Sequence, residues 1–274
     1  MGRYFLYRMH PFSIAELISP ALRKTILSAP QPLDEVEWSG LWTFGGFPEP
    51  FTRRDARFSR RWQTLRNAQL LREDVRELTR IGSIDQLLVL STLLTARSGQ
   101  QIVYASLAKE IRVSENTIRT WIGVLASLHQ GFLIKPWHRS VAAAIRKEPK
   151  WFLRDWSTLS DEGQRAETFV GCHLLKAVEG WTDLGFGQFD LYYLRDKQKR
   201  EVDFLVTKEQ KPWFLVEVKK TDTTLSPALA YMQQQTGAEH AFQVVMDEPY
   251  VNTDCFTRRT PTVVPARTFL SQLL

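Results

Sequence analysis

Three charged side chains in the C-terminal half of the sequence have the types and spacing of a metal-dependent hydrolytic site. Asp203 lies in an apolar run at 201–206, and Glu217 and Lys219 lie in a second apolar run at 213–219. An ionised carboxylate in such a run is costly unless it is paired or binds a cation. Carboxylate oxygens suit Mg²⁺ or Mn²⁺, and a nearby lysine can stabilise charge on a phosphate. The pattern therefore predicts phosphodiester hydrolysis.

The two runs are spaced as the arms of a β-hairpin. A turn centred near 209–211 would place Asp203 directly opposite Glu217, and such partners have Cβ atoms roughly 4.5–5.5 Å apart. We expect both carboxylates to be ligands of one Mg²⁺ or Mn²⁺. Period-two alternation would place Trp213, Leu215 and Lys219 on the face of Glu217, so that the lysine points into the same site.

A third carboxylate, Glu167, lies on a helix predicted over 165–178, before the site strands. We expect it to complete the catalytic set, although it could also be an ordinary surface glutamate. The strands have an alternative interpretation too. Asp203 or Glu217 could simply form an ion pair with one of the two lysines that end the second run, and the site would then be structural.

Residues 149–274 alternate between strand and helix patterns, which predicts an α/β domain with a mixed sheet. The expected strands are 151–153, 190–194, 201–206, 213–218 and 241–246, and the expected helices are 165–178 and 227–235.

Residues 83–148 have the pattern of a winged helix-turn-helix. Helices are predicted over 85–94, 106–111 and 115–128, with Ser114 as N-cap of the third and a wing strand over 131–135. Side chains early in the third helix and in the wing are placed to contact DNA: Asn116, Thr117, Arg119, Thr120, Lys135, His138 and Arg139. Such folds also connect proteins to one another, and a plain helical bundle is a further alternative.

The N-terminal part divides into two stretches. Residues 1–20 contain a strand-like run at 4–7 and a helix start with capping-box spacing between Ser13 and Glu16. Because a lone strand is unstable, the run must pair with this chain or another. Residues 21–82 form a lid-like helical segment with a long arginine-rich helix over 53–78.

Composition excludes several classes of protein. The chain has 274 residues and a net charge of +6, which suits a polyanionic partner such as DNA. No apolar run is long enough to cross a membrane, and no secretion signal is present, so we expect a cytoplasmic protein. Two cysteines without zinc-ligand spacing predict no disulfide framework and no structural zinc. No phosphate-binding loop of the G-x-x-x-x-G-K-[ST] type occurs, so no ATP site is expected.

The Asp203 and Glu217-Val218-Lys219 pattern resembles the catalytic core of the PD-(D/E)XK nuclease superfamily, and Glu167 matches its upstream helical acid. That resemblance implies a restriction-endonuclease-like fold in which Asp203 and Glu217 hold the metal and Lys219 assists the attacking water.

Nearly the whole chain resembles the C-terminal part of AAA-superfamily ATPases that carry a C-terminal domain of unknown function. The matching phrases are Gly2 to Leu17, Leu71 to Val75, the winged-helix stretch, Lys147 to Asp155, the Glu167 helix and the Asp203–Lys219 hairpin. The nucleotide-binding motifs of these ATPases do not occur in this sequence. The resemblance thus implies an α+β multi-domain fold in which residues 1–20 are a remnant of the ATPase core.

Two main functions remain open from the sequence. The first is a DNA-binding, Mg²⁺-dependent nuclease-like protein. The second is a non-catalytic DNA-binding or assembly module, which would partner an ATPase supplied by another chain, or a second copy of itself, through the N-terminal strand. A pure protein-interaction adaptor is a third possibility.

Overall fold

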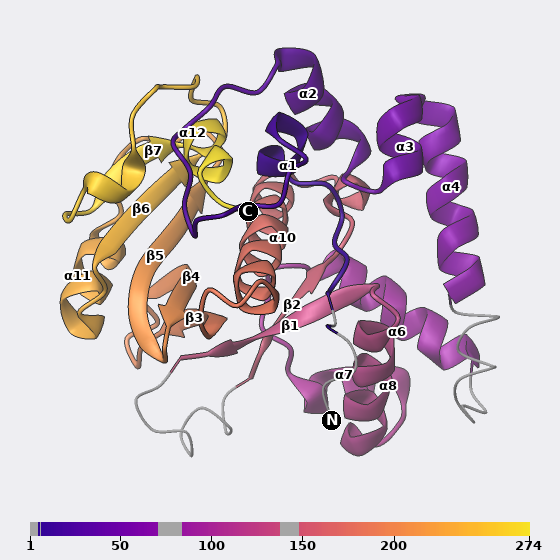
Figure 1. Ribbon diagram of the computed structural model, residues 1–274. Helices are drawn as coiled ribbons and strands as arrows, with labels where there is room; N and C mark the ends of the chain where they lie inside the picture. Colours follow the sequence, from indigo (N-terminus) through magenta and orange to yellow (C-terminus); the bar gives the residue numbers. More distant parts are fainter. Residues whose placement is uncertain (1–4, 6, 71–83, 138–147) are drawn as a thin grey trace.

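The fold is organised around one mixed sheet. The computed structural model describes residues 5, 7–70, 84–137 and 148–274 (Figure 1). The described strands form a seven-stranded sheet in the order β2-β1-β3-β4-β5-β6-β7. β1 is parallel to β3, and β5, β6 and β7 are mutually parallel, whereas the other neighbours are antiparallel. The predicted α+β class with a mixed sheet is confirmed. The strands are β1 (Gly131–Pro136), β2 (Lys150–Leu153), β3 (Phe189–Arg195), β4 (Glu201–Lys208), β5 (Lys211–Lys219), β6 (His240–Val245) and β7 (Thr262–Pro265).

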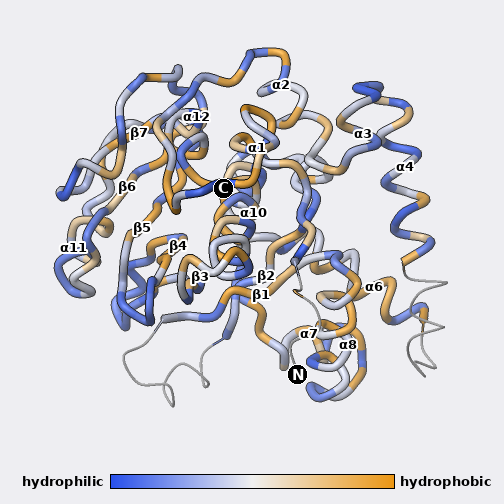
Figure 2. The backbone as a smooth tube through the Cα atoms, in the orientation of Figure 1, coloured by the Kyte–Doolittle hydropathy of each residue, from blue (hydrophilic) through white to orange (hydrophobic). Residues whose placement is uncertain are grey.

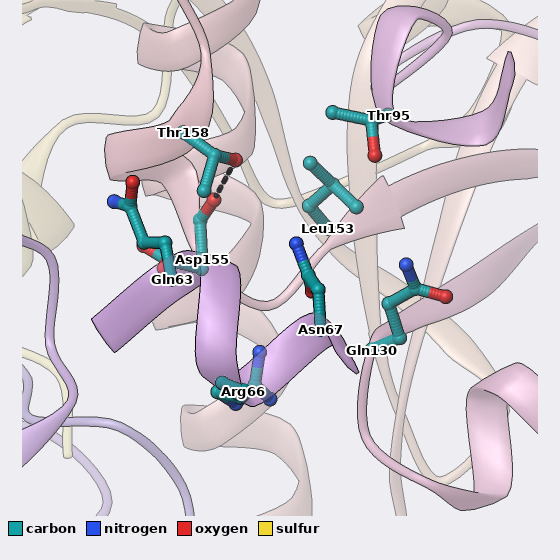
Figure 3. A pocket seen from close by; sticks show the side chains of 8 residues that line it. All are labelled: Gln63, Arg66, Asn67, Thr95, Gln130, Leu153, Asp155 and Thr158. Carbon is teal, nitrogen blue, oxygen red and sulfur yellow. Dashed lines mark hydrogen bonds between the residues drawn. The ribbon is translucent and has the colours of Figure 1, made fainter. Parts of the chain in front are cut away.

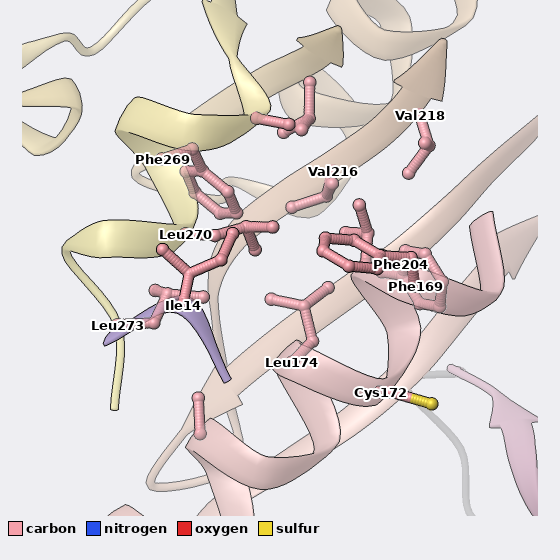
Figure 4. Packing of buried hydrophobic residues seen from close by; sticks show 14 of the residues in the cluster. Ile14, Phe169, Cys172, Leu174, Phe204, Val216, Val218, Phe269, Leu270 and Leu273 are labelled. Atoms are coloured by element: carbon pink, nitrogen blue, oxygen red, sulfur yellow. The ribbon is translucent and has the colours of Figure 1, made fainter. Parts of the chain in front are cut away.

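Helices cover the two faces of this sheet unequally. The main core lies between one face and the long helix α10 (Glu162–Asp183), together with α12 (Ala266–Ser271), as Figure 4 shows. The N-terminal helices α1 (Ile14–Ile18), α2 (Glu35–Phe44) and α3 (Pro48–Arg53) pack into the same core. The other face carries a smaller cluster under α11 (Pro227–Thr236).

The three helices predicted between 85 and 128 are present. They are α6 (Ile84–Ala96), α7 (Tyr104–Ile111) and α8 (Glu115–Ser127), and the β1–β2 pair follows them. Ser114 caps α8 by accepting a hydrogen bond from the Thr117 N–H at 3.0 Å. A backbone bridge joins Gln101 to Lys150 at the edge of β2.

Strand β2 joins helices α6–α8, called the helical part below, to the main core. Successive side chains of a strand point to opposite faces. Trp151 and Leu153 therefore enter the core of α6–α8, whereas Phe152 enters the core under α10. The sheet thus crosses the boundary expected at 148/149.

The long helix expected over 53–78 is wrong in its first part. Arg54 adopts a left-handed conformation with φ of 51°, which ends α3, and Asp55 then caps a new helix, α4 (Ala56–Gln69). The apolar periodicity did not reveal this break because both helices have an apolar side. Residues 71–78 lie outside the described residues. Figure 2 shows mostly hydrophilic residues along α4.

The strand expected at 4–7 is absent where it can be assessed. Phe5 and Tyr7 are in no strand and are 86% and 60% exposed, and Tyr4 and Leu6 lie outside the described residues. Arg8 fixes the following segment to α10 through ion pairs with Asp183 and Glu179. No helix in the described ranges is both long and apolar enough to cross a membrane.

Candidate active site

The β4–β5 hairpin brings the two predicted strand carboxylates together. Its register pairs Phe204 with Val216, and Asp203 and Glu217 are the next residues along the two strands. The Val218 N–H donates to Asp203 Oδ2 at 2.8 Å. This bond fixes the orientation of the Asp203 carboxylate beside β5.

Asp203 lies in a β-bulge of β4. Tyr192 of β3 pairs with Leu205 and Leu194 pairs with Val202, so two residues of β4, Asp203 and Phe204, lie opposite the single residue Tyr193. Such bulges re-aim side chains and are frequent beside active sites.

A second irregularity corrects the expected position of Trp213. The β4–β5 register shifts between Val206 and Thr207, and Trp213 packs in the main core against Trp181 at 5.5 Å between ring centroids. Leu215 lies on the other face, in the cluster under α11. Strict alternation from Trp213 was wrong because the bulge inserts an extra residue, whereas Lys219 does reach Glu217.

Glu217 has a buried oxygen without a partner among the described residues. Lys219 Nζ lies 2.8 Å from its Oε1, yet the residue is 8% exposed and its Oε2 has no hydrogen-bond partner within the described ranges. Desolvation by burial and then repulsion from Asp203 raise the pKa of Glu217 to about 7. A perturbed, buried carboxylate is a physical signature of functional sites.

The predicted helical acid, Glu167, joins the site through a lysine. Lys150 Nζ is 2.9 Å from Glu167, 2.7 Å from Glu201 and 3.8 Å from Asp203. Burial, followed by repulsion from Asp203, raises the pKa of Glu167 to about 8. Burial would lower the pKa of Lys150, but the three carboxylates together raise it above its ordinary value. The four predicted catalytic residues therefore meet in one region.

Sequence reasoning missed Lys150 and Glu201. Lys150 opens a strand whose other members are buried and apolar, and it is itself only 3% exposed. A lysine at that position is costly to bury unless it is paired, which was the available signal. Its partners could not be inferred, because β2 reaches the site across β1 and β3 rather than through a local hairpin.

The carboxylates of Asp203 and Glu217 are oxygen donors of the kind that a divalent ion prefers. With the side chains as they lie, no group of three or more His, Cys, Asp or Glu in the described parts of the chain forms a metal cage. The unpartnered Oε2 of Glu217 is nevertheless an oxygen donor of the kind that binds a hard cation.

The expected DNA-contacting residues lie mainly on one helix. Asn116, Arg119 and Thr120 of α8 are exposed, and so is Lys135 of β1. Thr117 is half-buried, and its hydroxyl lies 2.8 Å from the Ser114 hydroxyl in the cap. The Arg119 guanidinium stacks over the Tyr104 ring at 3.8 Å. His138 and Arg139 lie outside the described residues.

A cavity between α4 and the segment after β2 is too small for a substrate. It has a volume of about 30 Å³ and is lined by polar groups that include Arg66, Gln130 and Asp155 (Figure 3). Arg66 donates to the carbonyl of His129 at 3.2 Å, and burial raises the pKa of Asp155. A polar space of this size suits one or two water molecules, so we assign it no catalytic role.

Comparisons with known proteins give descriptions without an activity. Residues 36–161 match a domain of unknown function (DUF8612), and residues 162–261 match another domain of unknown function (DUF4143). An uncharacterized protein of Mycobacterium bovis and one of Mycobacterium tuberculosis are each 26% identical over 198 residues, which is 67% of this chain and 43% of the relative. The chain thus aligns with less than half the length of these curated relatives. No solved structure matches.

The second match agrees with the expected similarity of the C-terminal part to a domain of unknown function. It begins at the first residue of α10. It contains Glu167, Asp203, Glu217 and Lys219, whereas Lys150 falls in the first match.

Proposed function

We propose that this chain is a DNA-binding, nuclease-like protein that hydrolyses phosphodiester bonds with Mg²⁺ or Mn²⁺. The observation that carries the proposal is the state of Glu217. Its carboxylate is buried beside Asp203, and Oε2 has no donor among the described residues. A buried acceptor without a partner is rare and costly, and a hard cation would satisfy it.

The roles follow from the positions of the side chains. Asp203 and Glu217 would hold the ion, which would act as a Lewis acid and activate water. The Lys219 side chain is 34% exposed and touches Glu217, so its ammonium can reach an incoming phosphate and stabilise developing negative charge. Glu167 is held by Lys150, which also lies 3.8 Å from Asp203. Glu167 would therefore support the site without contacting the ion.

The helical part would position the DNA. Three helices followed by the β1–β2 pair, with a bridge from Gln101 to Lys150, have the element order of a winged helix. Asn116, Arg119 and Thr120 on the exposed side of α8 would contact the duplex. Because β2 also carries Lys150, the expected DNA-binding part and the acidic site share one strand.

A non-catalytic DNA-binding or assembly module that partners an ATPase in trans is the second candidate. The ion pairs of Lys150 and Lys219 favour it, because they already compensate much of the acidic charge. Under either candidate the chain would derive from an AAA ATPase and lack its nucleotide site. Under the second candidate, Mn²⁺ would leave the melting temperature unchanged. A metal site in the folded chain would instead stabilise the fold by about 2.7 kcal/mol at a free Mn²⁺ concentration of about 100 times Kd.

Cleavage of supercoiled and linear DNA with Mg²⁺, Mn²⁺ or EDTA tests the proposal. We expect metal-dependent cleavage that Lys219→Ala lowers by about 10²–10³-fold, the usual cost of losing one transition-state donor, while DNA retardation is kept. Lys220→Ala is the matched control, because the adjacent Lys220 pairs with Asp247 and Glu162 instead of the site acids. Equal cleavage by the Lys219 variant would refute the assigned site. Salt-sensitive retardation without any cleavage would support the second candidate.

A further inference from the structure

Two lysines contact different acids of the site. Lys219 contacts Glu217 at 2.8 Å. Lys150 contacts Glu167 at 2.9 Å and Glu201 at 2.7 Å. Asp203 is shared, since it repels Glu217 and also lies 3.8 Å from Lys150 Nζ.

Lys150 occupies the position that a second cation would need. Its Nζ lies within 4.0 Å of three carboxylates, and the side chain is only 3% exposed. The backbone of Lys150 is fixed because β2 pairs with β1 and also bridges Gln101. Two-metal nucleases place their ions roughly 3.5–4 Å apart. Here the corresponding place beside Asp203 is filled by an ammonium group.

The unsatisfied acceptor belongs to the acid that Lys219 contacts. Glu217 is nine-tenths buried, and its Oε2 has no hydrogen-bond partner in the described structure. By contrast, Glu201 is paired with both Lys150 and Arg195, and Glu167 is paired with Lys150. A divalent ion between Asp203 and Glu217 would therefore satisfy a buried oxygen that has no partner in the described residues.

We infer that Lys150 takes the place of a second metal ion, so that the site binds a single divalent cation between Asp203 and Glu217. This inference rests on the metal site of the proposed function. Lys150 is a positioning residue: it is too buried to touch a substrate, and it acts by holding Glu167 and Asp203 in place.

Titration of the full chain with Mn²⁺, with free Mn²⁺ followed by electron paramagnetic resonance, tests the inference without any activity measurement. We expect one ion per chain in the unmodified protein and two in Lys150→Met, where three carboxylates lose their internal cation. Lys176→Met is the matched control, because Lys176 is a largely buried lysine paired with Glu16 away from the site. It should keep one ion.

Two further variants test where the single ion binds, even if Lys150→Met fails to fold. Glu217→Gln should weaken Mn²⁺ binding by at least about tenfold, the lower end of the loss for groups that merely support a ligand. Glu201→Gln should keep one ion, and its loss there would overturn the inference. Two ions of similar affinity in the unmodified chain, or one ion in a folded Lys150→Met protein, would also overturn it.

The same titration separates this inference from the proposed function. One ion in the unmodified chain and two in Lys150→Met, without DNA cleavage, would refute hydrolysis and uphold the role of Lys150. DNA cleavage by a chain that binds two ions would uphold hydrolysis and refute the role of Lys150. Absence of Mn²⁺ binding would overturn both.

Discussion

At the scale of single residues, burial governs the proton affinity of the acidic site. Desolvation is the largest cause of the raised pKa values of Glu217, to about 7, and Glu167, to about 8. Repulsion from Asp203 comes next in both. A bound dication would reverse this balance by favouring the ionised carboxylates, so metal binding at neutral pH should release protons.

His173 should make the stability of the protein depend on pH. Burial lowers the pKa of His173 to about 4, from an ordinary value of roughly 6.5 in the unfolded chain. Between these values only the unfolded chain binds the proton, so the free energy of unfolding falls as pH falls. The total loss is roughly 3 kcal/mol by linkage. Urea unfolding at several pH values between 4 and 7 would measure it.

A conservative variant isolates this contribution from those of the carboxylates. His173 Nδ1 lies 2.8 Å from the Phe169 carbonyl, and Nε2 accepts the Ile14 N–H at 3.2 Å. His173→Gln keeps an acceptor for Ile14 but does not titrate. The difference in stability between the two proteins should therefore vary with pH. If their stability curves run parallel, His173 is not responsible.

The sequence predicted the acids of the site better than its cations. Asp203 and Glu217 could be brought together because they lie on two strands of one short hairpin, although the observed register also depends on the shift between Val206 and Thr207. Lys150 could not, because its strand reaches the site only through the order of the whole sheet. The same limit applies to Glu201, whose ion pair with Lys150 depends on that order.

At the scale of elements, the β1–β2 pair depends on one glycine. A Cβ added to Gly131 would lie 2.3 Å from a Trp151 ring carbon and 2.4 Å from the Phe152 carbonyl oxygen. Because a backbone carbonyl cannot move cheaply, Gly131→Ala should lower the free energy of unfolding by about 1–3 kcal/mol, the usual cost of overpacking. Thermal or urea unfolding would measure the change.

Gly123, in the neighbouring helix α8, supplies a control of opposite sign. Nothing lies within 4 Å of a Cβ added there, and alanine favours a helix interior over glycine by about 0.5–1 kcal/mol. Gly123→Ala should therefore stabilise the protein. A neutral Gly131→Ala variant would show that β2 can move away from β1.

Elements with strong local signals were predicted, and elements that depend on distant contacts were not. Helix α8 has a serine N-cap and apolar residues at helical spacing, and its predicted range differs from the observed one by one residue. The short strand β7 and helix α12 have weak patterns of their own. They are held by β6 and by the core under α10, which no local pattern reveals.

At the scale of the whole molecule, the described parts share continuous cores. Helices α1, α2 and α3 pack into the core of the sheet, and β2 contributes to that core and to the core of α6–α8. The N-terminal segment also meets the C-terminal one, since Ser13 Oγ donates to the Leu274 carbonyl at 3.1 Å. The segments expected from sequence as separate domains thus depend on one another for burial of apolar surface.

This continuity predicts one cooperative unfolding transition for the whole chain. Trp151 is 0% exposed and lies in the core of α6–α8, while the adjacent Phe152 is also 0% exposed and lies in the main core. Trp151→Ala should lower the free energy of unfolding by about 3–5 kcal/mol, as large aromatic truncations do, and should move a single transition without splitting it. Calorimetry would show this as agreement between the calorimetric and van't Hoff enthalpies in both proteins. Two separate transitions in the unmodified chain would mean that the helical part folds independently of the acidic site, and Lys150 would then lie at a joint between two bodies.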